Sequence, residues 1–288
     1  MIPRAAAFRA VAERLRRAGV ESAEHDAEAL LLQALGIPRA SLWFSPDSPL
    51  SEAESRALER LAGERERRVP LQLLLGEIPF HGVTLTVEPG VFIPRPETEI
   101  LVAEAEAALR GRPHGRLLEL GTGTGAVAVA LLAALPGWLA TAVDRSRSAL
   151  DLAARNAARN GVAARLALLP GDFLDPAFAP AGAPFDALVS NPPYVRSGDI
   201  PGLDPEVRDH DPHEALDGGP DGLDALRRVA SALPRWVLPG GFFALEIGAD
   251  QADEAVGLFR PPAPGVRVVP DLAGRPRVLL GRVESRDA

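Results

Sequence analysis

The 288-residue sequence contains no cysteine and no lysine, and it has only one methionine and one tyrosine. Without cysteine the chain has no disulfide bond, no thiolate metal site and no cysteine nucleophile. The absence of lysine means that all 31 residues counted as Lys or Arg are arginine. Together with the abundance of alanine, glycine and proline, this points to a compositionally biased genome more than to a function.

Long apolar runs and positive net charge are also missing. No stretch approaches the roughly 20 apolar residues of a membrane-spanning helix, and the N-terminus lacks a signal-peptide pattern. A net charge of −8 disfavours a broad grip on nucleic acid. His210 and His213 lie in a stretch rich in proline and aspartate, which is typical of a solvated loop rather than a metal site. We therefore expect a cytoplasmic monomer without membrane association, stable nucleic-acid complex or structural metal.

Hydrophobic periodicity divides the chain into a helical part and an α/β part. Up to about residue 70, apolar residues recur at helical spacing, and Ser51 with Glu54 forms a capping box, which predicts four or five short helices. The alternating stretch 80–87, followed by 88–90 and then 91–93, predicts a β-hairpin. We assign residues 1–72 to a helical bundle, 73–95 to a hairpin linker and 96–288 to an α/β domain.

Strands and helices alternate from Arg116 onward. This alternation predicts a mostly parallel sheet covered on both faces, with an antiparallel edge strand near the C-terminus. The stretch 196–220 is rich in proline, aspartate and glycine, and it is predicted to be a flexible loop that faces the substrate. The predicted strands are 117–120, 139–143, 166–169, 185–190, 241–247, 266–269 and 277–280, and the helices between them include 125–135, 147–160 and 222–233.

The most informative stretch, Asn191-Pro192-Pro193-Tyr194, follows the strand predicted at 185–190. Because neither proline has an N–H, this stiff turn presents hydrogen-bond acceptors and no donors of its own. The Asn191 side-chain oxygen and the Pro192 carbonyl can accept both hydrogens of one planar NH2 group, and Tyr194 can lie flat against that group. An ordinary strand-ending turn is the alternative. We favour a substrate site, with Asn191, Pro192 and Tyr194 as catalytic residues.

A glycine-rich loop, Gly121-Thr122-Gly123-Thr124-Gly125, follows the strand that contains Glu119. Glycines let the backbone turn sharply and approach a ligand closely, and open α/β sheets bind ligands at the carboxyl ends of their strands. Asp144 ends the second predicted strand, where a carboxylate can take two ribose hydroxyls. Asp172 and Phe173 follow the third, where they can meet the edge and the face of an adenine.

The glycine loop alone leaves two cofactors open. It satisfies a relaxed dinucleotide fingerprint, in which Asp144 would be the ribose acid. We favour S-adenosylmethionine over NAD, since Glu119 would repel a pyrophosphate but not a cationic cofactor. The turn at 191–194 would then present an NH2-bearing substrate to the cofactor's methyl group. Glu119 as a helix-cap partner and Asp172 as a turn residue are the alternatives at single positions.

At the level of whole motifs, the sequence resembles the release factor glutamine methyltransferases of the HemK/PrmC family. The resemblance covers nearly the whole chain. Its most specific parts are I-P-R-P-E-T-E at 93–99, N-P-P-Y at 191–194 and the helical N-terminal region. The glycine loop alone is weak evidence, because most S-adenosylmethionine enzymes share it. The other matching segments are 70–72 with 75–77, 90–92, 119–125, Ser190 before the turn, 214–222 and 245–248.

The resemblance implies a Rossmann-like, seven-stranded methyltransferase domain, S-adenosylmethionine-dependent, behind an N-terminal five-helix bundle and a connecting β-hairpin. It implies methylation of the glutamine side-chain amide in the G-G-Q motif of class 1 peptide-chain release factors, with S-adenosylhomocysteine as the product. The bundle and the hairpin would dock the release factor. The expected cofactor-binding residues are Glu119, Gly121, Thr122, Gly123, Thr124, Gly125, Asp144, Asp172, Phe173 and Asn191, and the expected substrate-binding residues are Asn191, Pro192, Pro193 and Tyr194.

Three other functions compete with this one. An adenine methyltransferase acting on nucleic acid would also use N-P-P-Y on a flipped base, but the negative charge and the lack of a basic recognition domain count against it. A glutamine methyltransferase of a ribosomal protein would differ in the linker after the hairpin. A non-catalytic cofactor-binding module predicts a decayed turn, whereas Asn191 and both prolines are present.

Overall fold

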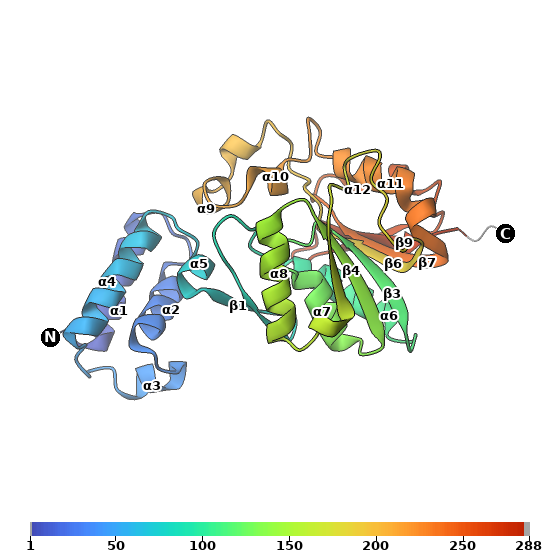
Figure 1. Ribbon diagram of the computed structural model, residues 1–288. Helices are drawn as coiled ribbons and strands as arrows, with labels where there is room; N and C mark the ends of the chain where they lie inside the picture. Colours follow the sequence, from blue (N-terminus) through green and yellow to red (C-terminus); the bar gives the residue numbers. More distant parts are fainter. Residues whose placement is uncertain (1, 285–288) are drawn as a thin grey trace. The chain divides into compact units, whose positions relative to one another are not determined.

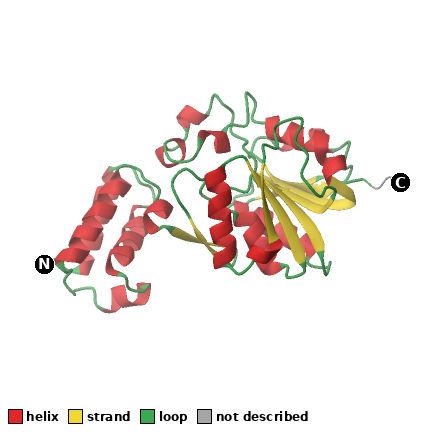
Figure 2. Cartoon of the chain, viewed as in Figure 1, coloured by secondary structure: helices red, strands yellow, loops and turns green. Residues whose placement is uncertain are grey.

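The computed structural model describes residues 2–284, which form two compact units. The first contains the described residues up to Ile78 together with Asp204–His210, and the second contains Pro79–Leu203 and the described residues from Asp211 onward. The first unit is helical, and the second is built around a β-sheet (Figure 2).

The first unit is a helical bundle with its own apolar core. Leu15, Leu30 and Leu31 are fully buried in it. A capping box at Ser51 and Glu54 starts α4, as the sequence predicts. Arg65 in α4 is buried and donates to Asp26 at 2.7 Å. The helices are α1 (Arg4–Arg17), α2 (Ala23–Leu35), α3 (Arg39–Phe44), α4 (Glu52–Glu66) and α5 (Leu71–Leu75).

The segment Asp204–His210, which includes α9 (Pro205–Arg208), belongs to this first unit although it lies far along the chain. Glu206 accepts from Arg68 at 2.6 Å and pairs with Arg65 at 2.8 Å. Burial alone would raise the pKa of Glu206, but these two guanidinium groups outweigh burial and lower the pKa to about 2. The carboxylate therefore stays ionised and fixes the segment to the bundle.

The hairpin is real, but the predicted position of its turn is wrong. The two strands are β1 (Glu77–Phe80) and β2 (Val83–Thr86), so 80–87 is not one strand and 91–93 is not its partner. The chain reverses at His81 and Gly82, which have φ angles of 39° and 80°. Successive positive φ angles match the twist of a two-residue hairpin turn, and a histidine in the first position hid that signal in the sequence.

The second unit contains a seven-stranded sheet in the order β5-β4-β3-β6-β7-β9-β8. Strands β3 to β7 are parallel, and β9 runs antiparallel to both β7 and β8, as predicted for the C-terminal edge. The strands are β3 (Gly115–Leu120), β4 (Trp138–Asp144), β5 (Leu166–Pro170), β6 (Phe185–Ser190), β7 (Val237–Glu246), β8 (Arg267–Pro270) and β9 (Pro276–Arg282).

Helices cover both faces of this sheet (Figure 1). One face carries α6 (Thr98–Leu109), α7 (Ala126–Ala134) and α8 (Arg147–Arg159), and the other carries α11 (Asp224–Trp236) and α12 (Ala252–Phe259). Strands buried on both faces have nearly continuous apolar runs, and this pattern predicts the strands at 185–190 and 241–247. The first matches β6, whereas β7 begins earlier than predicted, at Val237. No helix within residues 2–284 has the length and apolar character needed to cross a bilayer.

The stretch 196–220, predicted to be a loop, contains short helices. These are the 3-10 turn Ile200–Gly202, α9 and α10 (His213–Leu216). Another 3-10 turn, Ala163–Arg165, precedes β5. Because turns of three or four residues carry no periodic pattern, sequence reasoning could not separate them from loop.

Candidate active site

The carboxyl ends of four parallel strands bring the predicted site residues to one edge of the sheet. The glycine loop follows β3, Asp144 ends β4, and Asp172 and Phe173 come shortly after β5. Asn191 follows β6, in which Ser190 pairs with Leu120 of β3 and Leu245 of β7. Parallel strands end at the same edge, so one edge collects residues from distant parts of the chain.

The glycine loop uses the conformational freedom of its glycines. Gly121, Gly123 and Gly125 all have positive φ angles, between 54° and 79°. A Cβ at Gly125 would also lie only 3.0 Å from the Cβ of Ala153. The hydroxyls of Thr122 and Thr124 are buried with their residues, so both side chains help to shape the loop.

Asp144 holds the glycine loop in place. One carboxylate oxygen accepts from the Gly123 N–H at 2.8 Å, and the other accepts from the Ser146 N–H at 2.9 Å. Burial raises the pKa of Asp144, and the backbone N–H groups that face the carboxylate oppose that shift. Each oxygen retains a lone pair for a further donor, such as a hydroxyl.

Glu119 lies beneath the loop rather than at its surface. Its side chain is 2% exposed and accepts from the Thr122 hydroxyl at 2.6 Å. Burial raises the pKa of Glu119 to about 8, although the Thr122 hydroxyl lowers it in part. Glu119 would therefore repel a pyrophosphate only in its ionised form, and a bound cation would favour that form.

Glu119 should make the protein less stable as pH rises. The folded chain keeps the Glu119 proton up to pH about 8, whereas the unfolded chain releases it near pH 4.5. Between these values the unfolded state binds fewer protons, so the free energy of unfolding falls with increasing pH, by an amount on the order of a few kcal/mol. Urea unfolding from pH 4.5 to 8 measures this slope.

The raised pKa of Asp144 also lowers the free energy of unfolding as pH rises. A variant is therefore needed to isolate the contribution of Glu119. Glu119→Gln keeps an acceptor for Thr122 but has no proton to lose, and its slope against pH should be distinctly shallower than that of the wild type. Identical slopes would mean that Glu119 does not carry the effect.

Phe173 and Asp172 lie beside the glycine loop. A Cβ placed on Gly121 would be 3.7 Å from the Phe173 ring and 3.9 Å from the Asn191 carbonyl oxygen. Asp172 accepts from the Leu174 N–H at 2.9 Å, which is a turn contact, and leaves its other oxygen 3.6 Å from an Arg145 nitrogen. The loop, the aromatic ring and the start of the N-P-P-Y turn therefore meet at Gly121.

The turn at 191–194 keeps its acceptors available. The Asn191 side chain donates through Nδ2 to the Thr98 hydroxyl at 3.1 Å. Within residues 2–284, no protein donor bonds to Asn191 Oδ1 or to the Pro192 carbonyl. Tyr194 donates its hydroxyl to Glu246 at 3.0 Å. Burial raises the pKa of Tyr194, and the Glu246 carboxylate raises it further, so the phenol stays protonated.

Two side chains behind this turn were given no role by the sequence reasoning. Thr98, the first residue of α6, donates its hydroxyl to Glu246 at 2.8 Å. Glu246 ends β7 with only 1% of its surface exposed, and burial raises the pKa of this carboxyl. The available signal was an acid at the end of an otherwise apolar strand, which is a costly residue to bury without a purpose.

The D-G-G-P-D-G segment at 217–222 packs directly on the turn. A Cβ on Gly218 would lie 2.8 Å from Tyr194 Cα, and one on Gly222 would lie 2.4 Å from the Tyr194 carbonyl oxygen. Gln251 donates to the Tyr194 carbonyl at 3.0 Å and to the Gly222 carbonyl at 3.1 Å. These glycines permit a close backbone approach that braces the turn from outside.

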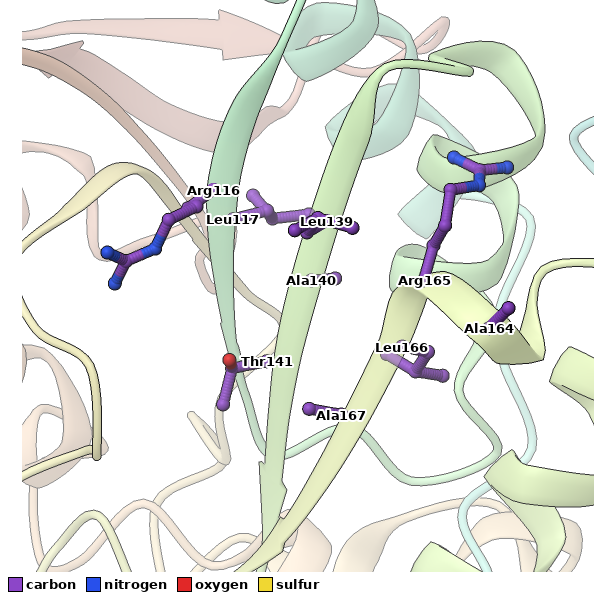
Figure 3. Close-up of a pocket in the computed structure, with 9 residues that line it drawn as sticks. All are labelled: Arg116, Leu117, Leu139, Ala140, Thr141, Ala164, Arg165, Leu166 and Ala167. Carbon is purple, nitrogen blue, oxygen red and sulfur yellow. The ribbon is translucent and has the colours of Figure 1, made fainter.

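A separate hollow lies elsewhere on the sheet (Figure 3). It has a volume of about 280 Å³ and is lined by the first residues of β3, β4 and β5, including Leu117 and Ala140. Arg165 at its rim already donates to three backbone carbonyls, and Arg116 donates to the Gly182 carbonyl. This hollow is at the opposite ends of the strands from the predicted residues and is not part of their site. No group of three potential metal ligands occurs in the described part of the chain.

Comparison with known proteins places the second unit among methyltransferases. The methyltransferase small domain model matches residues 82–201. The catalytic domain of hMettl16, solved with the MAT2A 3′UTR hairpin 6, aligns with a TM-score of 0.55 at 14% identity over 72% of this chain and 77% of its own. A T. thermophilus 16S rRNA methyltransferase, solved with AdoMet and guanosine, gives 0.51 at 20% identity over 72% of this chain and 50% of its own. At these identities the structures show the fold alone, which is the predicted Rossmann-like methyltransferase fold.

Matches to the first unit and to the whole chain show which family of methyltransferases this chain belongs to. The PrmC N-terminal domain model matches residues 6–76. Proteins named release factor glutamine methyltransferase are 42% identical over 85% of this chain and 84% of their own length in Geobacter sulfurreducens, and 42% identical over 96% and 97% in Cereibacter sphaeroides. The relative of the same name in Caulobacter vibrioides is 40% identical over 96% of this chain and 94% of its own. The chain belongs to the family of release factor glutamine methyltransferases, as the sequence predicts.

Proposed function

We propose that this chain transfers a methyl group from S-adenosylmethionine to the side-chain amide nitrogen of the glutamine in the G-G-Q motif of class 1 release factors. Membership of the family supports release factor glutamine methylation as the activity. One observation supports the assignment of the amide nitrogen as the methyl acceptor. Asn191 Oδ1 and the Pro192 carbonyl belong to a turn that begins beside the glycine loop, and neither oxygen has a protein donor within residues 2–284.

The residues around Gly121 fit the cofactor. Gly121 and Gly123 have positive φ angles, and no atom lies within 4 Å of where a Cβ on Gly123 would be, so the backbone is open to a ligand there. Asp144 offers the carboxylate that two ribose hydroxyls need, and Phe173 offers an aromatic ring beside Gly121. We assign the remaining cofactor contacts to Glu119, Thr122, Thr124, Gly125, Asp172 and Asn191. When bound, S-adenosylmethionine supplies a methyl group on an activated sulfonium.

The role of the turn is to orient a poor nucleophile. An amide nitrogen has a delocalised lone pair, so it needs positioning more than it needs a base. Asn191 Oδ1 and the Pro192 carbonyl hold its two hydrogens, Pro193 stiffens the turn, and the Tyr194 ring supports the flat amide. With the cofactor bound, the amide nitrogen would take the methyl carbon while the sulfonium left as a neutral thioether, and water would take the proton that the nitrogen releases.

The direct test uses purified wild-type protein, labelled S-adenosylmethionine and a purified class 1 release factor, followed by mass mapping. We expect one methyl group on the glutamine of the G-G-Q motif, and no label when that glutamine is replaced by alanine. An equal amount of adenine-containing DNA should stay unlabelled. Label on DNA, or on another residue of the release factor, would replace this function with one of its competitors.

We also assign residues 1–72, with the hairpin linker at 73–95, to docking of the release factor. Deleting residues 1–70 should therefore reduce modification of whole release factor far more than it reduces cofactor binding, because residues 96–288 contain the proposed chemistry. Steady-state rates and calorimetric cofactor titration measure the two effects on one preparation. A truncated chain that binds cofactor and modifies whole release factor at the wild-type rate would remove the docking role.

A further inference from the structure

Two buried side chains stand between Asn191 and the interior of the second unit. Asn191 donates to Thr98 at 3.1 Å, and Thr98 donates to Glu246 at 2.8 Å. The other oxygen of Glu246 accepts from Tyr194 at 3.0 Å. Thr98 and Glu246 are 2% and 1% exposed, so neither touches a large substrate. The chain of hydrogen bonds therefore links both ends of the 191–194 turn to one carboxylate.

We propose that Thr98 and Glu246 are positioning residues that decide which end of the Asn191 amide faces the substrate. This inference rests on the proposed function, because it concerns how the turn accepts the NH2 group of a glutamine. It assigns the threonine of the I-P-R-P-E-T-E segment and the acid at the end of β7 to one hydrogen-bond network.

The argument is one of hydrogen-bond polarity. Thr98 donates its single hydroxyl proton to Glu246 Oε2 at 2.8 Å. Thr98 Oγ1 then has only lone pairs to offer, and its neighbour must be a donor. The Asn191 amide satisfies this only by turning Nδ2 toward Thr98, which leaves Oδ1 on the opposite side. The acceptor oxygen that Glu246 presents to Thr98 therefore sets the orientation of the Asn191 amide through the Thr98 hydroxyl.

The orientation matters because the two ends of an amide have nearly the same shape but opposite chemistry. A flipped Asn191 would present two N–H donors to a substrate NH2, so donor would face donor. An acceptor pair would be reduced to the Pro192 carbonyl alone. Since Thr98 is buried and has a second partner, the network can hold the productive orientation before any substrate arrives.

The test replaces Thr98 in two opposite ways. Thr98→Ser keeps the hydroxyl and loses a methyl group, whereas Thr98→Val keeps the shape and loses the hydroxyl. A positioning role predicts near wild-type kcat for serine and a loss of roughly 10- to 100-fold for valine, with KM for the cofactor changed little in both. A role in packing alone predicts the reverse order, with valine retained and serine impaired.

Glu246→Gln supplies a second test at the other end of the network. Glutamine can accept from Tyr194 through its oxygen and donate to Thr98 through its nitrogen, which turns the Thr98 proton toward Asn191 and favours the flipped amide. We expect a fall in kcat of about the same size as for Thr98→Val, with a folded protein by circular dichroism. Unchanged kcat in both Thr98→Val and Glu246→Gln would overturn the proposal.

A measurement independent of activity separates this inference from the proposed function. The chain has three asparagines, Asn156, Asn160 and Asn191, so nitrogen-15 labelling of asparagine gives three side-chain amide signals that single substitutions assign. Hydrogen exchange at the Asn191 NH2 should be slowed in the wild type and in Thr98→Ser, and roughly tenfold faster in Thr98→Val because the bond to Thr98 is lost. Equal exchange in all three would refute the network, whereas an inactive wild type with the expected exchange pattern would refute only the function.

Discussion

Asn191→Ala should lower kcat for glutamine methylation by roughly 100- to 1,000-fold, a loss typical of removing a group that orients the reacting atoms. The substitution removes Oδ1, one of the two acceptors proposed for the substrate amide, and it removes the donor to Thr98. It leaves the glycine loop and Asp144 in place, so the dissociation constant for S-adenosylmethionine should change by no more than a few fold. Single-turnover rates and calorimetry on the same preparation measure the two quantities.

Asn160→Ala is the matched control for this variant. Asn160 bonds through its side-chain amide to the backbone of Thr84 in β2, with its nitrogen 2.9 Å from the Thr84 carbonyl. It lies outside the proposed site, so the same substitution there should reduce stability and leave kcat of the folded protein unchanged. Equal losses in both variants would assign the Asn191 effect to folding, and an Asn191→Ala enzyme as fast as its parent would reject the role of Asn191.

The second large effect is expected for Asp144→Ala and concerns cofactor affinity. Asp144 holds the Gly123 N–H and the Ser146 N–H, and we propose that it also binds the ribose hydroxyls. Hydrogen bonds to a charged group contribute about 1.5–3 kcal/mol each, so losing them should weaken S-adenosylmethionine binding by roughly two orders of magnitude. Isothermal titration calorimetry checks this directly.

Asp151→Ala serves as the control for that variant. Asp151 is an exposed residue of α8, and its ion pair within residues 2–284 is with Arg147, four positions earlier, at 3.1 Å. Its removal changes the net charge by the same amount without touching the loop, so cofactor affinity should stay within about twofold of the wild type because exposed pairs contribute little. If both variants weakened binding equally, the Asp144 effect would be one of net charge and not of ribose recognition.

The parts of the site that the sequence predicted are those fixed by local chemistry. The acceptor character of 191–194 follows from two adjacent prolines, which have no N–H in any fold. The order of the ligand-binding pieces follows from the parallel alternation of strands, which puts the ends of β3, β4, β5 and β6 at one edge. The strand at 185–190 was predicted to the residue because apolar runs between turn residues depend on near neighbours in the chain.

The prediction of the hairpin failed for a local reason of a different kind. Its turn depends on His81 taking a positive φ, a conformation that most non-glycine residues avoid. Apolar and polar residues alternate across most of 80–87, so the pattern does not reveal the turn.

The alternation of strands and helices, the parallel sheet and the missing N–H groups of the two prolines were therefore determined by the sequence by itself. Tertiary structure alone decided what stands behind that turn. Thr98 precedes Asn191 by 93 positions and Glu246 follows Tyr194 by 52. Only the packing of α6 against β7 and the pairing of β7 with β6 bring them into hydrogen-bond contact. Burial likewise raises the pKa of Glu119, which the sequence suggested would repel a pyrophosphate, to about 8. The pairing of distant residues and the dielectric around a charge depend on the whole fold, and no local pattern encodes them.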